Sequence, residues 1–140
     1  NSLMRFHTKA HIRWDDLDAF NHVNNAKYLT YVQEARVALF WAERRAKGLP
    51  AIMDDMVVAR AEVDFIKPIY DTAVEVDIAI WCSKIGRAAF DLQYEISSEK
   101  DGIYAKVKTV QVVVDMETKR ARSLQEHEVE FLKNYLEENE

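Results

Sequence analysis

A long helix with apolar side chains on several faces is the feature that most constrains how this chain can fold. Its main stripe has alternating spacings of four and three residues, which is typical of a helix: Tyr28, Val32, Ala35, Leu39, Ala42 and Ala46. The pattern predicts a helix over residues 25–46, about 33 Å long. Gly48 and Pro50 then stand where helices commonly end. A second apolar row, with Leu29 and Phe40, means that this helix must be enclosed, so we expect it at the centre of the molecule.

A sheet is the predicted enclosure, because the rest of the chain alternates between apolar and polar residues. The alternating segments are residues 6–14, 57–65, 74–82, 88–96 and 103–114. Short connections at 84–86 and 101–102 indicate antiparallel neighbours. The apolar alternation of the last strand changes phase, which predicts a bulge or a strong twist near Thr109. Ser123 to Glu126 has the form of a capping box and predicts a C-terminal helix. The expected fold is α+β, with a five-stranded antiparallel sheet wrapped around one long helix.

Composition places the chain among single globular domains. It has 140 residues, of which 49% are hydrophobic, and only three Gly and two Pro, so we expect one domain over residues 1–140. Residues 1–3 precede Met4, and an origin in the expression vector is left open for them. The net charge of −5 argues against nonspecific binding to nucleic acid. No apolar run is long enough for a membrane span, and no signal peptide is evident. The single cysteine, Cys82, predicts a buried thiol in a reducing cytoplasm.

The segment from Trp14 to Tyr28 carries the candidate chemistry. It holds three carboxylates (Asp15, Asp16 and Asp18), one histidine (His22) and three asparagines (Asn21, Asn24 and Asn25) between an expected strand and the long helix. We expect Asn24 or Asn25 to cap the helix, which leaves backbone N–H groups that can hold an oxygen gaining negative charge. A carboxylate upstream can face the same point. This loop is therefore the predicted active site.

The same segment resembles a known family. Asp16-Leu17-Asp18 and His22-Val23-Asn24-Asn25-Ala26-Lys27-Tyr28, followed by Glu34-Ala35-Arg36, resemble the hotdog-fold acyl-CoA thioesterases. Within them the chain is most similar to the 4-hydroxybenzoyl-CoA thioesterase branch and its bacterial long-chain acyl-CoA thioesterases of the third type. The resemblance covers residues 6–122. Asn21 is a departure, because many members carry Gly before the histidine.

The resemblance implies a set of residue roles. Asp18 would be the catalytic general base or nucleophile, and the backbone N–H at Asn25 would polarise the thioester carbonyl. The active site would lie between two subunits of a homodimer or a homotetramer built as a dimer of dimers. Acyl-CoA is the implied partner, with no metal, redox cofactor or nucleic acid. The residues implied to bind the substrate are Asn24, Tyr28, Lys67, Lys84, Gly86 and Arg87.

Several of these residues also have structural interpretations. An aspartate with a usual pKa of about 3.9 is ionised at neutral pH, so Asp18 can accept a proton, but it can also stabilise a turn. His22 is either a general acid or a brace for the loop. Asp15 and Asp16 are expected to form turns or to be solvated. Glu34 is expected to pair with a nearby arginine, although a related hotdog branch uses a helix glutamate as its base.

The predicted function is hydrolysis of a fatty or aromatic acyl-CoA to the free acid and CoA. A non-catalytic acyl-CoA-binding or regulatory module remains an alternative, because its binding residues would look the same. A hotdog hydratase is less well supported, since its Asp-x-Asn-Pro-x-His loop is absent. The sequence leaves open the acyl length and the choice between CoA and an acyl-carrier protein.

Overall fold

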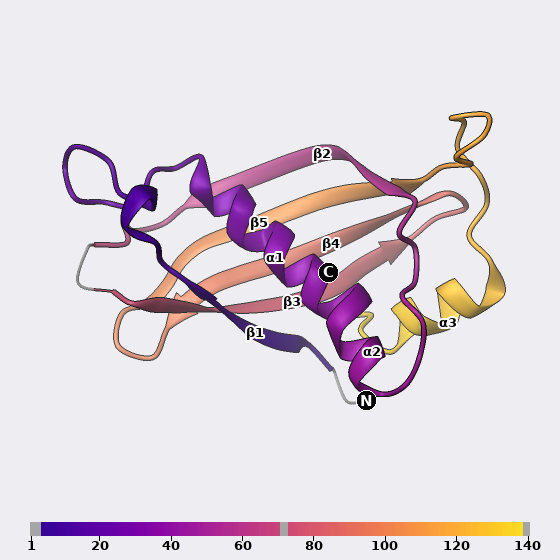
Figure 1. Ribbon diagram of the computed structural model, residues 1–140, viewed down its shortest axis with the longest axis horizontal. Helices are drawn as coiled ribbons and strands as arrows, with labels where there is room; N and C mark the ends of the chain where they lie inside the picture. Colours follow the sequence, from indigo (N-terminus) through magenta and orange to yellow (C-terminus); the bar gives the residue numbers. More distant parts are fainter. Residues whose placement is uncertain (1–3, 71–72, 139–140) are drawn as a thin grey trace.

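A computed structural model of the chain describes residues 4–70 and 73–138, so that Asn1, Ser2 and Leu3 lie outside the described residues. Figure 1 shows a long helix lying across one face of a single sheet. The strands are β1 (Phe6–His11), β2 (Met56–Phe65), β3 (Glu75–Ile85), β4 (Ala89–Ser98) and β5 (Gly102–Val113). They form a five-stranded sheet in the order β1-β3-β4-β5-β2, and each neighbouring pair is antiparallel. The predicted fold is confirmed.

The central helix is continuous but not uniform. It consists of α1 (Lys27–Val37), a π-helical turn η2 (Ala38–Ala42) and α2 (Glu43–Ala46). The predicted apolar stripe faces the sheet, and its first four members, together with Tyr31, are 1% exposed or less. Gly48 has a φ of 75° and ends the helix as predicted. The π-helical turn was not predicted, because one extra residue per turn hardly alters an apolar pattern of this length.

Two predicted boundaries are wrong. The first strand ends at His11 and is followed by a 3-10 turn, η1 (Trp14–Asp16), which leaves Trp14 outside the strand and 88% exposed. The C-terminal helix α3 (Glu126–Lys133) begins after Gln125, whose backbone N–H donates to the Glu128 carboxylate at 2.7 Å. The capping box is therefore Gln125 to Glu128, and Ser123 instead accepts a hydrogen bond from Arg87. The second error arises because short polar motifs fix a helix start only to within a few residues.

The predicted phase change in the last strand is also wrong. β5 keeps its alternation and buries two polar residues, Thr109 and Gln111, on the face toward the helix. The nearby bulge lies on β2, between Val58 and Arg60. The sequence pattern placed Val110 and Val112 inward because they are apolar, whereas in the structure the inward residues are Thr109 and Gln111. The consequence is a polar patch beneath the central helix.

Candidate active site

Asp16 anchors the loop between β1 and α1. This carboxylate is 2% exposed and accepts hydrogen bonds from the Tyr31 hydroxyl at 2.7 Å and the Arg13 backbone N–H at 2.9 Å. The Asn24 backbone N–H donates to the Asp16 carbonyl at 2.8 Å. Burial and the bond to Asp16 both raise the pKa of Tyr31, so the phenol stays protonated and keeps donating. Asp16 is thus a buried structural group that closes the η1 turn, so the turn-forming interpretation is confirmed and the solvated one is wrong.

Asp18 is half-buried at the turn of the same loop. Its Oδ1 atom accepts the backbone N–H groups of Phe20 at 2.9 Å and His22 at 3.2 Å. Asn21 adopts a φ of 62°, which an asparagine tolerates, and this conformation closes the turn. No hydrogen bond from the described part of the chain reaches Oδ2. Asp18 is therefore held in a fixed orientation by one oxygen while the other remains available to accept a proton or attack a carbonyl.

The start of the central helix lies a few residues further on. The Asn24 side chain accepts the Ala26 N–H at 2.9 Å, and the Asn24 carbonyl accepts the Lys27 N–H at 2.9 Å. Asn24 therefore closes the turn that precedes α1, but the helix itself begins after Ala26 without a side-chain cap, so the prediction that Asn24 or Asn25 caps the helix is wrong. Within residues 4–70 and 73–138, the Asn25 N–H makes no hydrogen bond. A free N–H at the positive end of a helix can stabilise a developing oxyanion.

A shallow cavity of about 230 Å³ lies beside this helix start. Asn25, Tyr28 and Lys67 line it together with Phe65, Ile66 and Pro68. The Tyr28 ring packs edge-on against Phe65, with ring centroids 5.1 Å apart. The Lys67 ammonium donates to the Asp101 carbonyl at 2.6 Å, which places it at the rim. Three of the predicted site residues thus share one cavity.

His22 closes the same turn, because its backbone bonds Asp18 through both its N–H and its carbonyl. Its backbone pairs with Tyr70, and its ring packs edge-on against the Tyr70 ring at a centroid distance of 4.8 Å. Its carbonyl accepts the Asp18 N–H at 2.8 Å. No hydrogen bond from the described residues reaches the imidazole. These contacts are those of a brace that shapes the Asp18 turn.

Within one chain, three of the predicted substrate-binding residues lie far from Asp18: Lys84, Gly86 and Arg87. They belong to the hairpin between β3 and β4, which Figure 1 shows at the end of the sheet opposite the β1–α1 loop. β3 has 11 residues, so the hairpin and the loop are about 35 Å apart along the strand. The fold of a single chain does not bring these residues to Asp18.

Sequence reasoning missed a buried polar chain under the helix. Arg36 of α1 donates to the Tyr94 hydroxyl at 3.0 Å, and that hydroxyl contacts the Thr109 hydroxyl at 2.7 Å. Thr109 also bonds the Gln111 amide. Burial raises the pKa of Tyr94 despite the nearby Arg36, so Tyr94 is a neutral partner. The sequence signal for this buried chain was the pair of polar residues, Thr109 and Gln111, at positions that continue the inward alternation of β5.

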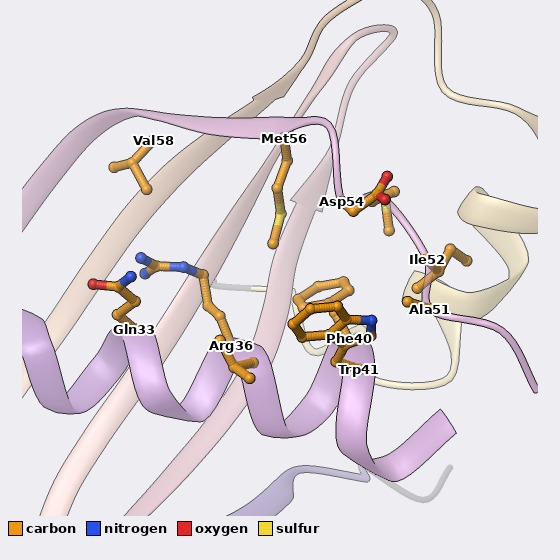
Figure 2. A pocket seen from close by; sticks show the side chains of 11 residues that line it. Gln33, Arg36, Phe40, Trp41, Ala51, Ile52, Asp54, Met56 and Val58 are labelled. Carbon is orange, nitrogen blue, oxygen red and sulfur yellow. The ribbon is translucent and has the colours of Figure 1, made fainter. Parts of the chain in front are cut away.

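Arg36 also lines a cavity of about 420 Å³ between the central helix and the start of β2. Figure 2 shows the Gln33 amide and the Arg36 guanidinium near one end of this cavity, toward Val58, and Asp54 at the other. Its walls are mainly apolar, with Phe40, Trp41, Met53 and Met56. The helix therefore borders a second, larger cavity, which shares no lining residue with the one at Asn25.

The remaining candidates have structural partners. Glu34 pairs with Arg13 at 3.1 Å, as predicted. Cys82 is buried, and burial raises the pKa of its thiol to about 11, in agreement with an inert side chain. Among the described residues, no three His, Cys, Asp or Glu side chains gather in a group that could hold a metal ion. None of the described helices has the length and apolar character needed to cross a membrane.

A long helix on a five-stranded antiparallel sheet, with a carboxylate loop leading into the helix start, is the architecture of the hotdog-fold thioester hydrolases. The chain belongs to the thioesterase-like superfamily, whose sequence model matches residues 12–133. No curated protein matches the sequence.

Solved structures share the fold of this chain. A predicted thioesterase from Bacillus stearothermophilus is 21% identical with a TM-score of 0.81, covering 98% of this chain and 100% of that one. A thioesterase from Thermus thermophilus, solved with coenzyme A and Zn, is 28% identical with a TM-score of 0.76 and 92% of each chain covered. A DHNA-CoA thioesterase from Staphylococcus aureus is 19% identical with a TM-score of 0.74, covering 94% of this chain and 88% of that one.

Proposed function

We propose that the protein hydrolyses an acyl-CoA to the free acid and CoA, with Asp18 as the catalytic carboxylate. The observation that carries this proposal is the geometry of the loop, where Asp18 is fixed through Oδ1 and precedes a helix start with a free Asn25 N–H. The relative from Thermus thermophilus was solved with coenzyme A, which supports CoA as the carrier of the acyl group. The apolar cavity beside the helix suits a fatty or aromatic acyl group.

The reaction needs a nucleophile and a site for negative charge. As a general base, Asp18 takes a proton from water while the oxygen attacks the thioester carbon. The charge that develops on the carbonyl oxygen is stabilised by the Asn25 N–H. The C–S bond then breaks, CoA leaves as a thiolate that takes up a proton, and the acid is released. As a nucleophile, Asp18 would first form a mixed anhydride that water then hydrolyses. After a single turnover in ¹⁸O-labelled water, label in the Asp18 carboxylate would establish the nucleophilic route, because it arises only when water attacks the aspartyl carbonyl of the anhydride.

The proposed assembly is a homodimer joined through the β2 edge. β2 is an end strand of the sheet, and it exposes Val57, Val58 and Phe65, which are each between 45% and 49% exposed. An unpaired ten-residue edge with apolar side chains is a site for pairing with a second strand. A twofold axis pairs the two β2 strands antiparallel, so the Met56 end of one subunit lies near the Phe65 end of the other. A homotetramer built from such dimers would keep the same contact.

This pairing accounts for the distant basic residues. The β3–β4 hairpin lies at the same end of the sheet as Met56, since Met56 pairs with Val113, and Ala89 pairs with Val112. In the dimer, the hairpin of one subunit and the Asp18 loop of the other therefore lie at the same end. Lys84, Gly86 and Arg87 of one copy can then contact the CoA that is cleaved at Asp18 of the other, with Asn24, Tyr28 and Lys67 nearer the thioester.

Thiol release from a panel of acyl-CoA esters tests the proposal, with binding of the same esters measured by calorimetry. We expect release of free CoA well above background for at least one fatty or aromatic ester. Binding without release of thiol from any ester would instead identify an acyl-CoA-binding module. Acyl-carrier-protein thioesters in the same panel determine whether CoA is the preferred carrier.

A further inference from the structure

The cavity between the central helix and β2 contains a cation that the catalytic proposal does not use. Arg36 is half-buried, and within the described residues no carboxylate lies within 4.0 Å of its guanidinium. Its one side-chain hydrogen bond there goes to the Tyr94 hydroxyl, which stays neutral. A guanidinium has five N–H donors, so most of them remain without a protein partner.

The Arg36 guanidinium borders two adjoining cavities. Arg36 lines both the cavity of about 420 Å³ and the adjoining one of about 230 Å³ near Thr109. Figure 2 shows the guanidinium between the helix and β2, beside the Gln33 amide. Asp54 lines the same cavity, but Figure 2 places it at the far end from Arg36, next to Ala51 and Ile52. One end of the cavity is therefore cationic with an added amide, and the middle is apolar.

The chain of buried side chains behind Arg36 holds it in place. Tyr94 is 1% exposed, Thr109 is 1% exposed and Gln111 is 0% exposed. Such a chain is costly to bury unless each member is bonded, and each of these three is. It orients the guanidinium from β4 and β5 while the helix supplies its stem. A fixed guanidinium is well suited to bidentate binding of a carboxylate.

We propose that Arg36 and Gln33 bind a carboxylate at the far end of the acyl group, so that the preferred substrates are CoA monoesters of dicarboxylic acids. This inference rests on the proposed acyl-CoA hydrolysis. Within one chain Arg36 lies nearer to Asn25 along the helix than Phe40 does, so the acyl group would come from a thioester at Asp18 of the second copy in the proposed dimer and enter the cavity at its Met56 end. The apolar middle of the cavity would then contact the methylene groups, and Arg36 would contact the terminal carboxylate. A CoA phosphate is the other anion that could reach a guanidinium, but the surrounding Phe40, Met53 and Met56 suit an acyl chain rather than a hydrated diphosphate.

The test compares two ladders of CoA esters of equal length. One ladder runs from succinyl-CoA to dodecanedioyl-CoA and ends in a carboxylate, and the other ends in a methyl group. We expect kcat/KM for the best carboxylate-ended ester to exceed that of its methyl-ended partner by about 10- to 100-fold, the range of a charge-assisted hydrogen-bond pair. In Arg36→Met the ratio should fall to about one or below, and Arg36→Lys should be intermediate because it keeps the charge without the fork. Arg120→Met, at an exposed arginine, is the matched control and should keep the wild-type ratio.

Binding of free octanedioate provides a readout that does not need turnover. Calorimetry should detect octanedioate binding to the wild type, weakened at least tenfold in Arg36→Met, with octanoate bound more weakly than octanedioate. A wild-type ratio near one, or the same ratio in wild type and Arg36→Met, would overturn the proposal while leaving acyl-CoA hydrolysis intact. Competition by free CoA but not by octanedioate would assign Arg36 to a phosphate and also overturn it. Absence of thiol release from both ladders would instead refute the proposed function.

Discussion

Asp16 and Asp18 have the same side chain two residues apart, and the fold gives them different tasks. Asp16 is buried and bonded to Tyr31 and Arg13, so its charge is used to hold the loop. Asp18 is half-buried and bonded through one oxygen only, so it retains an accepting atom. The difference comes from the surroundings, because Tyr31 reaches Asp16 from the helix.

Removing the Tyr31 hydroxyl tests the structural task. Tyr31→Phe leaves the buried Asp16 carboxylate without one of its donors, so we expect the free energy of unfolding to fall by about 1–3 kcal/mol. Chemical denaturation measures this loss. Tyr70→Phe is the matched control, since Tyr70 is 53% exposed, and it should change stability by less than about 0.5 kcal/mol. An equal effect of the two substitutions would show that the Tyr31–Asp16 bond does not stabilise the loop.

At the scale of elements, the apolar pattern predicts all five strands and the long helix. It does so because burial of one face imposes a period on each element. The pattern fails where polar residues satisfy one another inside the protein, as Thr109 and Gln111 do on β5. It also fails at Ser123, where a short motif resembled a helix start but the tertiary contact with Arg87 was preferred. The Asp18 loop was located from its sequence motif. The contacts of Arg36 could not be predicted in this way, because they depend on which side chains of β5 face the helix.

The C-terminal helix α3 is held by an ion cluster. Arg122 pairs with Asp55 at 2.9 Å and with Glu128 at 2.9 Å, and the Glu128 side chain is 4% exposed. Burial alone would raise the pKa of Glu128, but the hydrogen bonds from Arg122 and the Gln125 N–H outweigh burial and hold the pKa below its usual value. The charged form is therefore favoured in the folded protein.

This lowered pKa predicts a pH dependence with a definite sign. The folded state favours ionised Glu128 more than the unfolded state does, so its contribution is present above the usual glutamate pKa of about 4.3 and is lost as the pH falls further. Glu128→Gln should reduce the free energy of unfolding by about 2 kcal/mol near neutral pH, and the difference from wild type should shrink below about pH 4. Urea denaturation across pH measures both effects. Glu130→Gln, at an exposed position on α3, is the control, and a difference that grew toward acid pH would contradict the account.

At the scale of the whole molecule, the account requires a second copy of the chain. The double substitution Val57→Glu with Val58→Glu places like charges on the β2 edge of both subunits, so we expect monomers at micromolar concentration. Because the active site is proposed to lie between subunits, kcat/KM should fall by at least about tenfold. Light scattering and thiol release on the same samples measure the two effects together.

A matched double substitution controls for added charge. Val74→Glu with Met4→Glu changes two apolar side chains that are 73% and 51% exposed away from β2, and it should keep the oligomeric state. Full activity in a β2 variant shown to be monomeric would exclude an active site shared between subunits. An unchanged dimer would exclude the β2 edge as the contact.

The rate of thiol release by Asp18→Asn, compared with wild type, tests the central claim most directly. Asparagine keeps the size of the side chain and its accepting oxygen but cannot take a proton at neutral pH. We expect kcat to fall by about 10²- to 10⁴-fold with a melting temperature close to that of wild type. Asp15→Asn, at an exposed carboxylate of the same loop, should retain the wild-type rate. A wild-type rate in Asp18→Asn would contradict the claim and would move the search for the base to Glu34.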